Sequence, residues 1–153
     1  MGIAILYPVI AQIILTLAVL VGMAVQRQRA FSSGKVEPQD AAVDTDIFPT
    51  HARQCANCYR NQFELPVLFY VLCLVAQITR TADLIFVILA WIFVISRVLH
   101  AFEHTTTNVV TRRGAFFGIG AIVVMIMTAY LLFRLLLPHR RAAAHQGSRR
   151  DRI

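Results

Sequence analysis

Four side chains that could bind an anionic ligand lie on one face of a predicted helix. The stripe consists of Arg97, His100, His104 and Asn108, which follow an apolar run at intervals of three, four and four residues. Because each helical residue turns by about 100°, the last three lie at about 300°, 340° and 20° from Arg97, with Glu103 off the stripe. Guanidinium groups bind carboxylates, and the other side chains supply further hydrogen bonds. We call this set the Arg97 stripe.

A second polar stripe lies earlier in the chain. Asn57, Asn61 and Glu64 fall within about 60° of one another on a helix, and Pro66 follows and is expected to kink it. Glu64 lies about two turns inside an apolar segment, where ionisable groups face a partner or a polar cavity. We expect it to be buried within reach of Arg97. The two stripes either pair and link the helices by hydrogen bonds, or form a pocket for a small anionic ligand.

The composition indicates that a membrane surrounds these stripes. Of the 153 residues, 58% are hydrophobic and only 15% are charged. A bilayer core requires about 20 apolar residues per helix. Four segments meet this requirement once their polar stripes are included: residues 3–25, 59–78, 84–104 and 115–137. The first has no basic residue before it and is too long for a signal peptide, so we interpret it as a permanent span. The sequence predicts an all-α, four-span integral membrane protein.

The connections determine which side chains meet. Spans two and three are joined by a short turn, so they run antiparallel and place both stripes at the membrane face that holds loops one and three. Arg29 and Arg112 arrive at the same face. The third helix must continue at least to Thr106 to keep the Arg97 stripe intact, despite the β-branched threonines there. We expect this stripe to face protein, because lipid offers its polar groups no partners.

The remaining segments carry most of the charge. Residues 26–57 form the one long loop, expected to be irregular with at most a short helix, and residues 138–153 form a basic tail expected to be disordered. The +7 net charge reflects juxtamembrane arginines and this tail, so nucleic-acid binding is not expected. Loop charges favour a cytoplasmic location for loops one and three, whereas the tail arginines favour the opposite orientation. We adopt the first, in the plasma or inner membrane if the chain is bacterial.

Cysteines and histidines allow weaker alternatives. Cys55 and Cys58 have the spacing of a redox pair, and His51 could join them at a zinc site, but a fourth ligand is not evident. His100 and His104 are spaced for a metal or haem, although buried hydrogen-bonding histidines are commoner. We therefore assign no metal site.

Three short motifs together resemble one family. NQFELPVLF at residues 61–69 resembles the Asn-x-x-Glu motif of the second helix of the MAPEG family, the membrane-associated proteins of eicosanoid and glutathione metabolism. RAF at residues 29–31 resembles the arginine-bearing end of that family's first helix. The Arg97 stripe, followed by Arg112, is similar to the third-helix pattern of bacterial-type members. The resemblance covers about residues 3–137.

This resemblance implies a homotrimer with glutathione sites between subunits and lipophilic electrophiles arriving from the lipid. It implies catalytic roles for Arg29 and Arg112, with Arg113 an alternative to Arg112. The implied glutathione-binding residues are Asn61, Glu64, Arg97, His100, His104 and Asn108.

The chain departs from the family at two positions. It has Asn57 where the family has an arginine and Tyr59 where the family has histidine or glutamine, and Arg53 lies one step out of register. These changes remove part of the expected carboxylate clamp. Two functions therefore stay open: a glutathione-dependent transferase or peroxidase, and a non-catalytic membrane protein of the same fold that binds lipid or acts as a scaffold or interaction subunit.

Overall fold

The computed structural model describes the backbone of residues 3–42 and 44–150 and the side chains up to Leu136. Its elements are α1 (Leu6–Ser32), α2 (Pro38–Ala41), α3 (Thr50–Arg60), the 3-10 helix η1 (Asn61–Phe63), α4 (Leu65–Ile78), α5 (Leu84–Thr105) and α6 (Val110–Arg150). The segment Thr50–Ile78 acts as one span, so the described chain contains four helices long and apolar enough to cross a membrane. This confirms the predicted all-α, four-span architecture, and the protein is an integral membrane protein.

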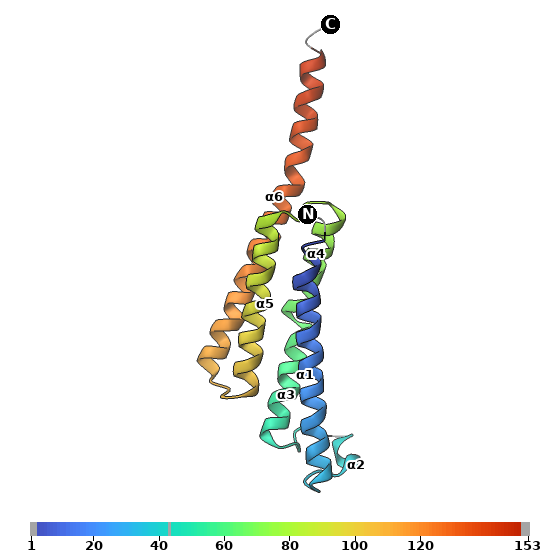
Figure 1. Cartoon of the computed structure of the whole chain (residues 1–153), viewed down its shortest axis with the longest axis vertical. Coiled ribbons are helices and arrows are strands. Elements are labelled where there is room, and N and C mark those ends of the chain that lie inside the picture. Colours follow the sequence, from blue (N-terminus) through green and yellow to red (C-terminus); the bar gives the residue numbers. More distant parts are fainter. Residues whose placement is uncertain (1–2, 43, 151–153) are drawn as a thin grey trace.

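The helices form a bundle of two packed pairs. In Figure 1, α5 lies along α6, and α1 lies along α3 and α4, while further contacts join the pairs. Phe69 of α4 stacks on Phe93 of α5, with ring centroids 4.5 Å apart. A side chain at Gly120 of α6 would place its Cβ 3.1 Å from the Ser96 hydroxyl of α5. The missing side chain therefore lets these two helices approach closely.

The surface of the bundle is apolar over most of its length. On α1 alone, Ile10, Ile14, Leu17 and Val21 each have at least half of their side-chain surface exposed. Exposed apolar surface of this extent is suited to lipid or to another membrane helix, since neither offers hydrogen bonds.

The second span is interrupted near Pro66, as the sequence predicts. Pro66 lies in the first turn of α4, where its missing N–H costs no helical hydrogen bond. The backbone of Glu64 has φ −99° and ψ −101°, outside the helical region. The span therefore changes direction at Asn61–Leu65, directly beside the predicted polar layer.

Several predicted boundaries are wrong. α1 continues through residues expected to be loop, and α3 begins at Thr50, so the irregular connection covers only residues 33–49 and contains the short α2. α6 begins at Val110 rather than at residue 115. Amphipathic and polar helix ends outside the bilayer carry no transmembrane signal, and the prediction omitted them for this reason. The tail predicted to be disordered over residues 138–153 is helical as far as Arg150, because α6 continues beyond the apolar segment, so this prediction is wrong up to that residue; residues 151–153 lie outside the described part of the chain.

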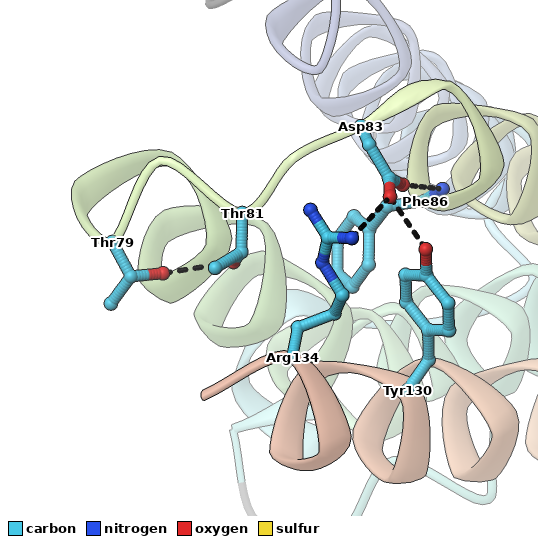
Figure 2. A network of polar contacts seen from close by, with 6 residues as sticks. All are labelled: Thr79, Thr81, Asp83, Phe86, Tyr130 and Arg134. Atoms are coloured by element: carbon cyan, nitrogen blue, oxygen red, sulfur yellow. Dashed lines mark hydrogen bonds and ion pairs between the residues drawn. The ribbon is translucent and has the colours of Figure 1, made fainter. Parts of the chain in front are cut away.

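A polar network closes the end of the bundle that holds the α4–α5 turn (Figure 2). Asp83 caps α5 by accepting a hydrogen bond from the Phe86 amide at 3.0 Å. Its other carboxylate oxygen accepts one from the Tyr130 hydroxyl at 2.5 Å and lies 3.6 Å from the Arg134 guanidinium. One carboxylate thereby ties the turn to α6.

Candidate functional site

The two polar stripes meet within the single chain, as their antiparallel arrangement predicts. The Arg97 guanidinium donates to the Asn61 carbonyl oxygen at 3.2 Å. The Asn61 side-chain amide lies 3.3 Å from Nε2 of His100. Arg97 is fully buried, and His100 is only 2% exposed. These three residues form the Arg97 cluster, which joins the break in the second span to the middle of α5.

His100 extends this cluster to the fourth span. Its Nδ1 lies 3.0 Å from the backbone carbonyl of Arg113 on α6. A carbonyl oxygen only accepts, so Nδ1 must carry the hydrogen in this contact. Nε2 then accepts from the Asn61 amide, and a neutral imidazole satisfies both bonds. One histidine thus connects η1, α5 and α6.

Arg97 is a buried cation that forms no ion pair with a carboxylate among the described side chains. Its Nε and one terminal nitrogen have no hydrogen-bond partner among the described side chains. Its guanidinium carbon lies 5.6 Å from the centre of the Phe117 ring, which attracts cations. A charge in a span is unfavourable by about 2.5–3.5 kcal/mol on insertion scales. Two donor nitrogens of this buried guanidinium therefore stay free of partners among the described residues.

Glu64 does not supply that anion within the subunit. Its side chain is exposed, and no ion pair joins it to Arg97 among the residues whose side chains are described. The predicted burial and pairing of Glu64 are therefore wrong for the single chain. The cause is the non-helical backbone at Glu64, which takes this residue off the helical face assumed in the prediction.

The Arg97 stripe is shorter than predicted. α5 ends at Thr105, and Asn108 lies in the following turn with φ +51°. The hydroxyls of Thr105 and Thr106 bond back to carbonyls one turn earlier, at 2.9 and 2.6 Å. The Asn108 amide then donates to the Glu103 carbonyl at 2.7 Å. The continuous helical stripe as far as Asn108 is wrong, because hydrogen bonds from a turn replace those of the next helical residues.

Glu103 organises this turn, although the prediction placed it off the stripe as an uninvolved residue. It is 7% exposed, and its carboxylate accepts from the Thr107 hydroxyl and from the Val109 amide at 3.2 Å. Asn108 in turn accepts from the Arg113 guanidinium at 2.6 Å. The turn therefore holds the side chain of Arg113, the residue whose backbone carbonyl accepts from His100.

The other predicted site residues lie around the cluster rather than in it. His104 is 3% exposed and packs edge-on against His100, with ring centroids 5.5 Å apart. The two residues predicted to be catalytic, Arg29 and Arg112, are both exposed. Arg29 lines a small cleft with Lys35 and His51. The chain thus contains a buried polar cluster and, around it, exposed charged side chains.

The comparison with protein families agrees with this arrangement. The MAPEG family model matches residues 5–133, which cover all four spans. The chain belongs to the MAPEG family. No curated protein and no solved structure matches the chain. Membership in this family supports the conclusion that the chain is a membrane protein of the glutathione and eicosanoid metabolism family.

Two polar residues of this MAPEG chain were missed by the sequence analysis. The Gln12 side chain donates to the Gln62 side chain at 3.0 Å, and both residues are at most 1% exposed. Gln62 also donates to the Cys58 carbonyl at 3.4 Å. Gln12 is the one amide side chain within residues 3–25, the predicted first span, and this isolation was a usable signal. The bridge fixes α1 against the break in the second span.

Asn57 stands where the MAPEG family has an arginine, and two arginines lie close to it in the structure. Asn57 is exposed on α3 and lines a cleft beside this helix. Arg53, one helical turn before it, and Arg60, one turn after it, line the same cleft. Positive charge is therefore present near the position of the missing family arginine. His51, Cys55 and Cys58 do not form a metal cluster with a further ligand within the described part of the chain.

Proposed function

We propose that this MAPEG protein is a glutathione-dependent transferase or peroxidase that acts on lipophilic electrophiles at a polar site between neighbouring subunits of a homotrimer. The observation that carries the proposal is the fully buried Arg97, which has unpartnered donors beside Asn61 and His100. Glutathione has two carboxylates, and an arginine with free donors in a region of low polarity binds a carboxylate strongly.

A neighbouring subunit would complete the site. Glu64, Arg29 and Arg112 are exposed on the isolated chain, at the same membrane face as the Arg97 cluster. An ionised side chain that faced hydrocarbon would be unfavourable by about 2.5–3.5 kcal/mol. A second copy that covers this rim would remove the penalty and would bring Arg29 and Arg112 towards a ligand held by Asn61 and Glu64.

The chemistry requires a glutathione thiolate, because the thiolate and not the thiol is the nucleophile. The thiol proton passes to water, and the guanidinium of Arg29 or Arg112 stabilises the sulfur anion. In transfer, the sulfur forms a bond to an electrophilic carbon as the leaving group departs with its electron pair. In peroxide reduction, two glutathiones are oxidised to one disulfide, while the hydroperoxide is reduced to an alcohol and water.

One observation favours the second function, a non-catalytic lipid-binding, scaffolding or interaction subunit. Asn57 stands where the family has an arginine, so part of the carboxylate clamp is absent at that position. A protein that kept the fold and lost glutathione would still bury Arg97, and it would show no response to the peptide.

Thermal unfolding of the purified protein with increasing glutathione tests the proposal. We expect stabilisation that follows mass action, about 2.7 kcal/mol at a hundred times the Kd. The response should disappear in Arg29→Ala and persist in Arg80→Ala, a control at the other end of the bundle. An S-methylated glutathione should stabilise the protein equally, because binding does not need the thiol. Absence of any response in the wild type would favour the non-catalytic function, and light scattering of the same sample tests the trimer.

A further inference from the structure

The cleft beside α3, which is larger than the one beside Arg29, lies outside the Arg97 cluster. It has a volume of about 320 Å³ and is formed by the end of α1, the connection before α3, and α3 itself, with Asn108 contributed by the turn after α5. Its charged lining residues are Arg27, Arg53, Arg60 and Asp46. Small-molecule sites begin at roughly 300 Å³, so the cleft is large enough for a lipid headgroup or a small metabolite.

The arginines reach this cleft because of helix geometry. Arg53, Asn57 and Arg60 are separated by four and three residues, which places them within about 60° of one another on one face of α3. Arg27 approaches from α1, with its guanidinium carbon 5.1 Å from the centre of the Phe48 ring. Phe48 in turn packs edge-on against Phe31, with ring centroids 5.5 Å apart. An aromatic support therefore holds one of the three guanidinium groups in place.

The positive charge of the cleft is not neutralised by the protein. Arg27 has a buried Nε without a hydrogen-bond partner among the described side chains. Asp46 is the single carboxylate against three guanidinium groups, and no ion pair within the described residues involves any of them. Guanidinium donors that remain free in a concave site fit an oxyanion with several acceptor oxygens.

The position of the cleft points to the class of ligand. Arg27 follows Val25, one of the exposed apolar residues of α1, by two positions, so the cleft lies where the apolar surface of the bundle ends. Phosphate groups of anionic lipids occupy this layer, and basic pockets beside membrane helices bind them. From this geometry we infer that the cleft binds a phosphate group, carried by an anionic lipid or by a soluble phosphate compound. This inference does not rest on the proposed glutathione chemistry, and Asn108 is the one residue of the cleft lining that the family resemblance also implies in glutathione binding.

Binding to the full-length protein in detergent tests the inference. Native mass spectrometry and thermal unfolding would compare phosphatidylglycerol, phosphatidylcholine and inorganic phosphate as probes. The double variant Arg53→Gln with Arg60→Gln should weaken binding of phosphatidylglycerol by about tenfold or more, since charge-assisted hydrogen bonds are lost. Arg80→Gln removes the same kind of charge from the other end of the bundle and should change binding by less than about twofold.

The outcomes separate a built site from diffuse attraction. A response to phosphatidylglycerol alone assigns the site to lipid, and competition by inorganic phosphate assigns it to a soluble phosphate. Because Arg53 and Arg60 are exposed, the variants should fold. Full retention of binding in Arg53→Lys with Arg60→Lys would overturn the site, since lysine keeps the charge and lacks the planar fork. Equal binding of the two lipids, or joint loss of the lipid and glutathione responses in the glutamine variant, would also overturn a separate phosphate site.

Discussion

Asp83, Tyr130 and Arg134 pair with one another at one end of the bundle, whereas Arg97 lies inside the bundle, near the middle of α5, with two unpartnered nitrogens. The first group joins a turn to α6 and is partly exposed to solvent, so little desolvation free energy is needed to keep its charges there. Arg97 is fully buried in a span and is not matched by a buried carboxylate in the described chain. A paired network stabilises the fold, while an unpaired buried cation is best explained by a ligand or a partner subunit.

The largest effect is expected from Arg97→Met, which replaces the cation by an apolar side chain of similar length. We expect the glutathione response to be lost, because a charge-assisted hydrogen bond contributes about 1.5–3 kcal/mol. The stability of the unliganded protein should fall little or rise, since an uncompensated buried charge is removed. Arg134→Met is the matched control, with the glutathione response retained and the unliganded protein less stable. The opposite pattern would show that Arg97 is structural.

A smaller loss is expected from Asp83→Ala. The substitution removes the cap of α5, which typically contributes about 0.5–2 kcal/mol, and it leaves the Tyr130 hydroxyl without its acceptor. The midpoint of thermal unfolding should therefore fall, while glutathione binding stays unchanged. Asp46→Ala, in the open cleft at the other end, is the control for loss of a carboxylate. Equal midpoints for the two variants would mean that the network contributes nothing to stability.

The Gln12–Gln62 bridge should contribute less than either charged group. Hydrogen bonds between helices in membranes average about 0.6 kcal/mol in double-mutant cycles. A cycle of Gln12→Leu, Gln62→Leu and the double variant, followed by reversible unfolding in detergent, should give a coupling of about that size. Coupling of zero would indicate that the two amides find other partners, such as the Cys58 carbonyl that already accepts from Gln62.

The smallest effect concerns the pH dependence of the paired end. Burial raises the pKa of the Asp83 carboxyl, but hydrogen bonds from Tyr130 and the Phe86 amide, together with the Arg134 charge, outweigh it and lower the pKa below its ordinary value of 3.8. A carboxyl with a lowered folded-state pKa stabilises the protein above its unfolded pKa, and this contribution disappears as pH falls through the folded value. Between about pH 6 and about pH 3, the wild type should lose more stability than Asp83→Asn. Parallel pH profiles would contradict the assignment.

Part of the candidate site could be predicted from the sequence, because it depends on helix periodicity and on the direction of neighbouring spans. Arg97 and His100 lie one helical turn apart on α5, and the short turn before α5 requires Asn61 to lie opposite them. The burial of Arg97 and His100 follows, because lipid offers no partners to their polar groups. The spacing of these three residues along the sequence is thus sufficient to predict that they lie in contact.

The positions of Glu64 and Asn108 could not be predicted from helix periodicity. Both were placed by assuming that a helix continues, and in both cases the backbone leaves the helix, at η1 and at the turn after Thr105. At such positions a helical hydrogen bond competes with a bond from Glu103, a threonine hydroxyl or a turn amide. Small free-energy differences decide which bond forms, and the periodicity of the sequence gives no information about them. The same holds for the cleft around Arg27, whose three sides come from separate elements.

By itself, the sequence determined the medium and the fold class, since four apolar segments of bilayer length have one stable solution in lipid, namely helices that satisfy their own backbone hydrogen bonds. It also determined that Asn61 of the second span would meet Arg97 and His100 of the third. The tertiary structure alone decided which of those polar groups are paired. That Arg97 lacks a carboxylate, that Glu103 holds a turn, and that Gln12 reaches Gln62 depend on side-chain contacts between distant segments. Such contacts depend on packing at ångström distances, and the order of residues along the chain does not specify them.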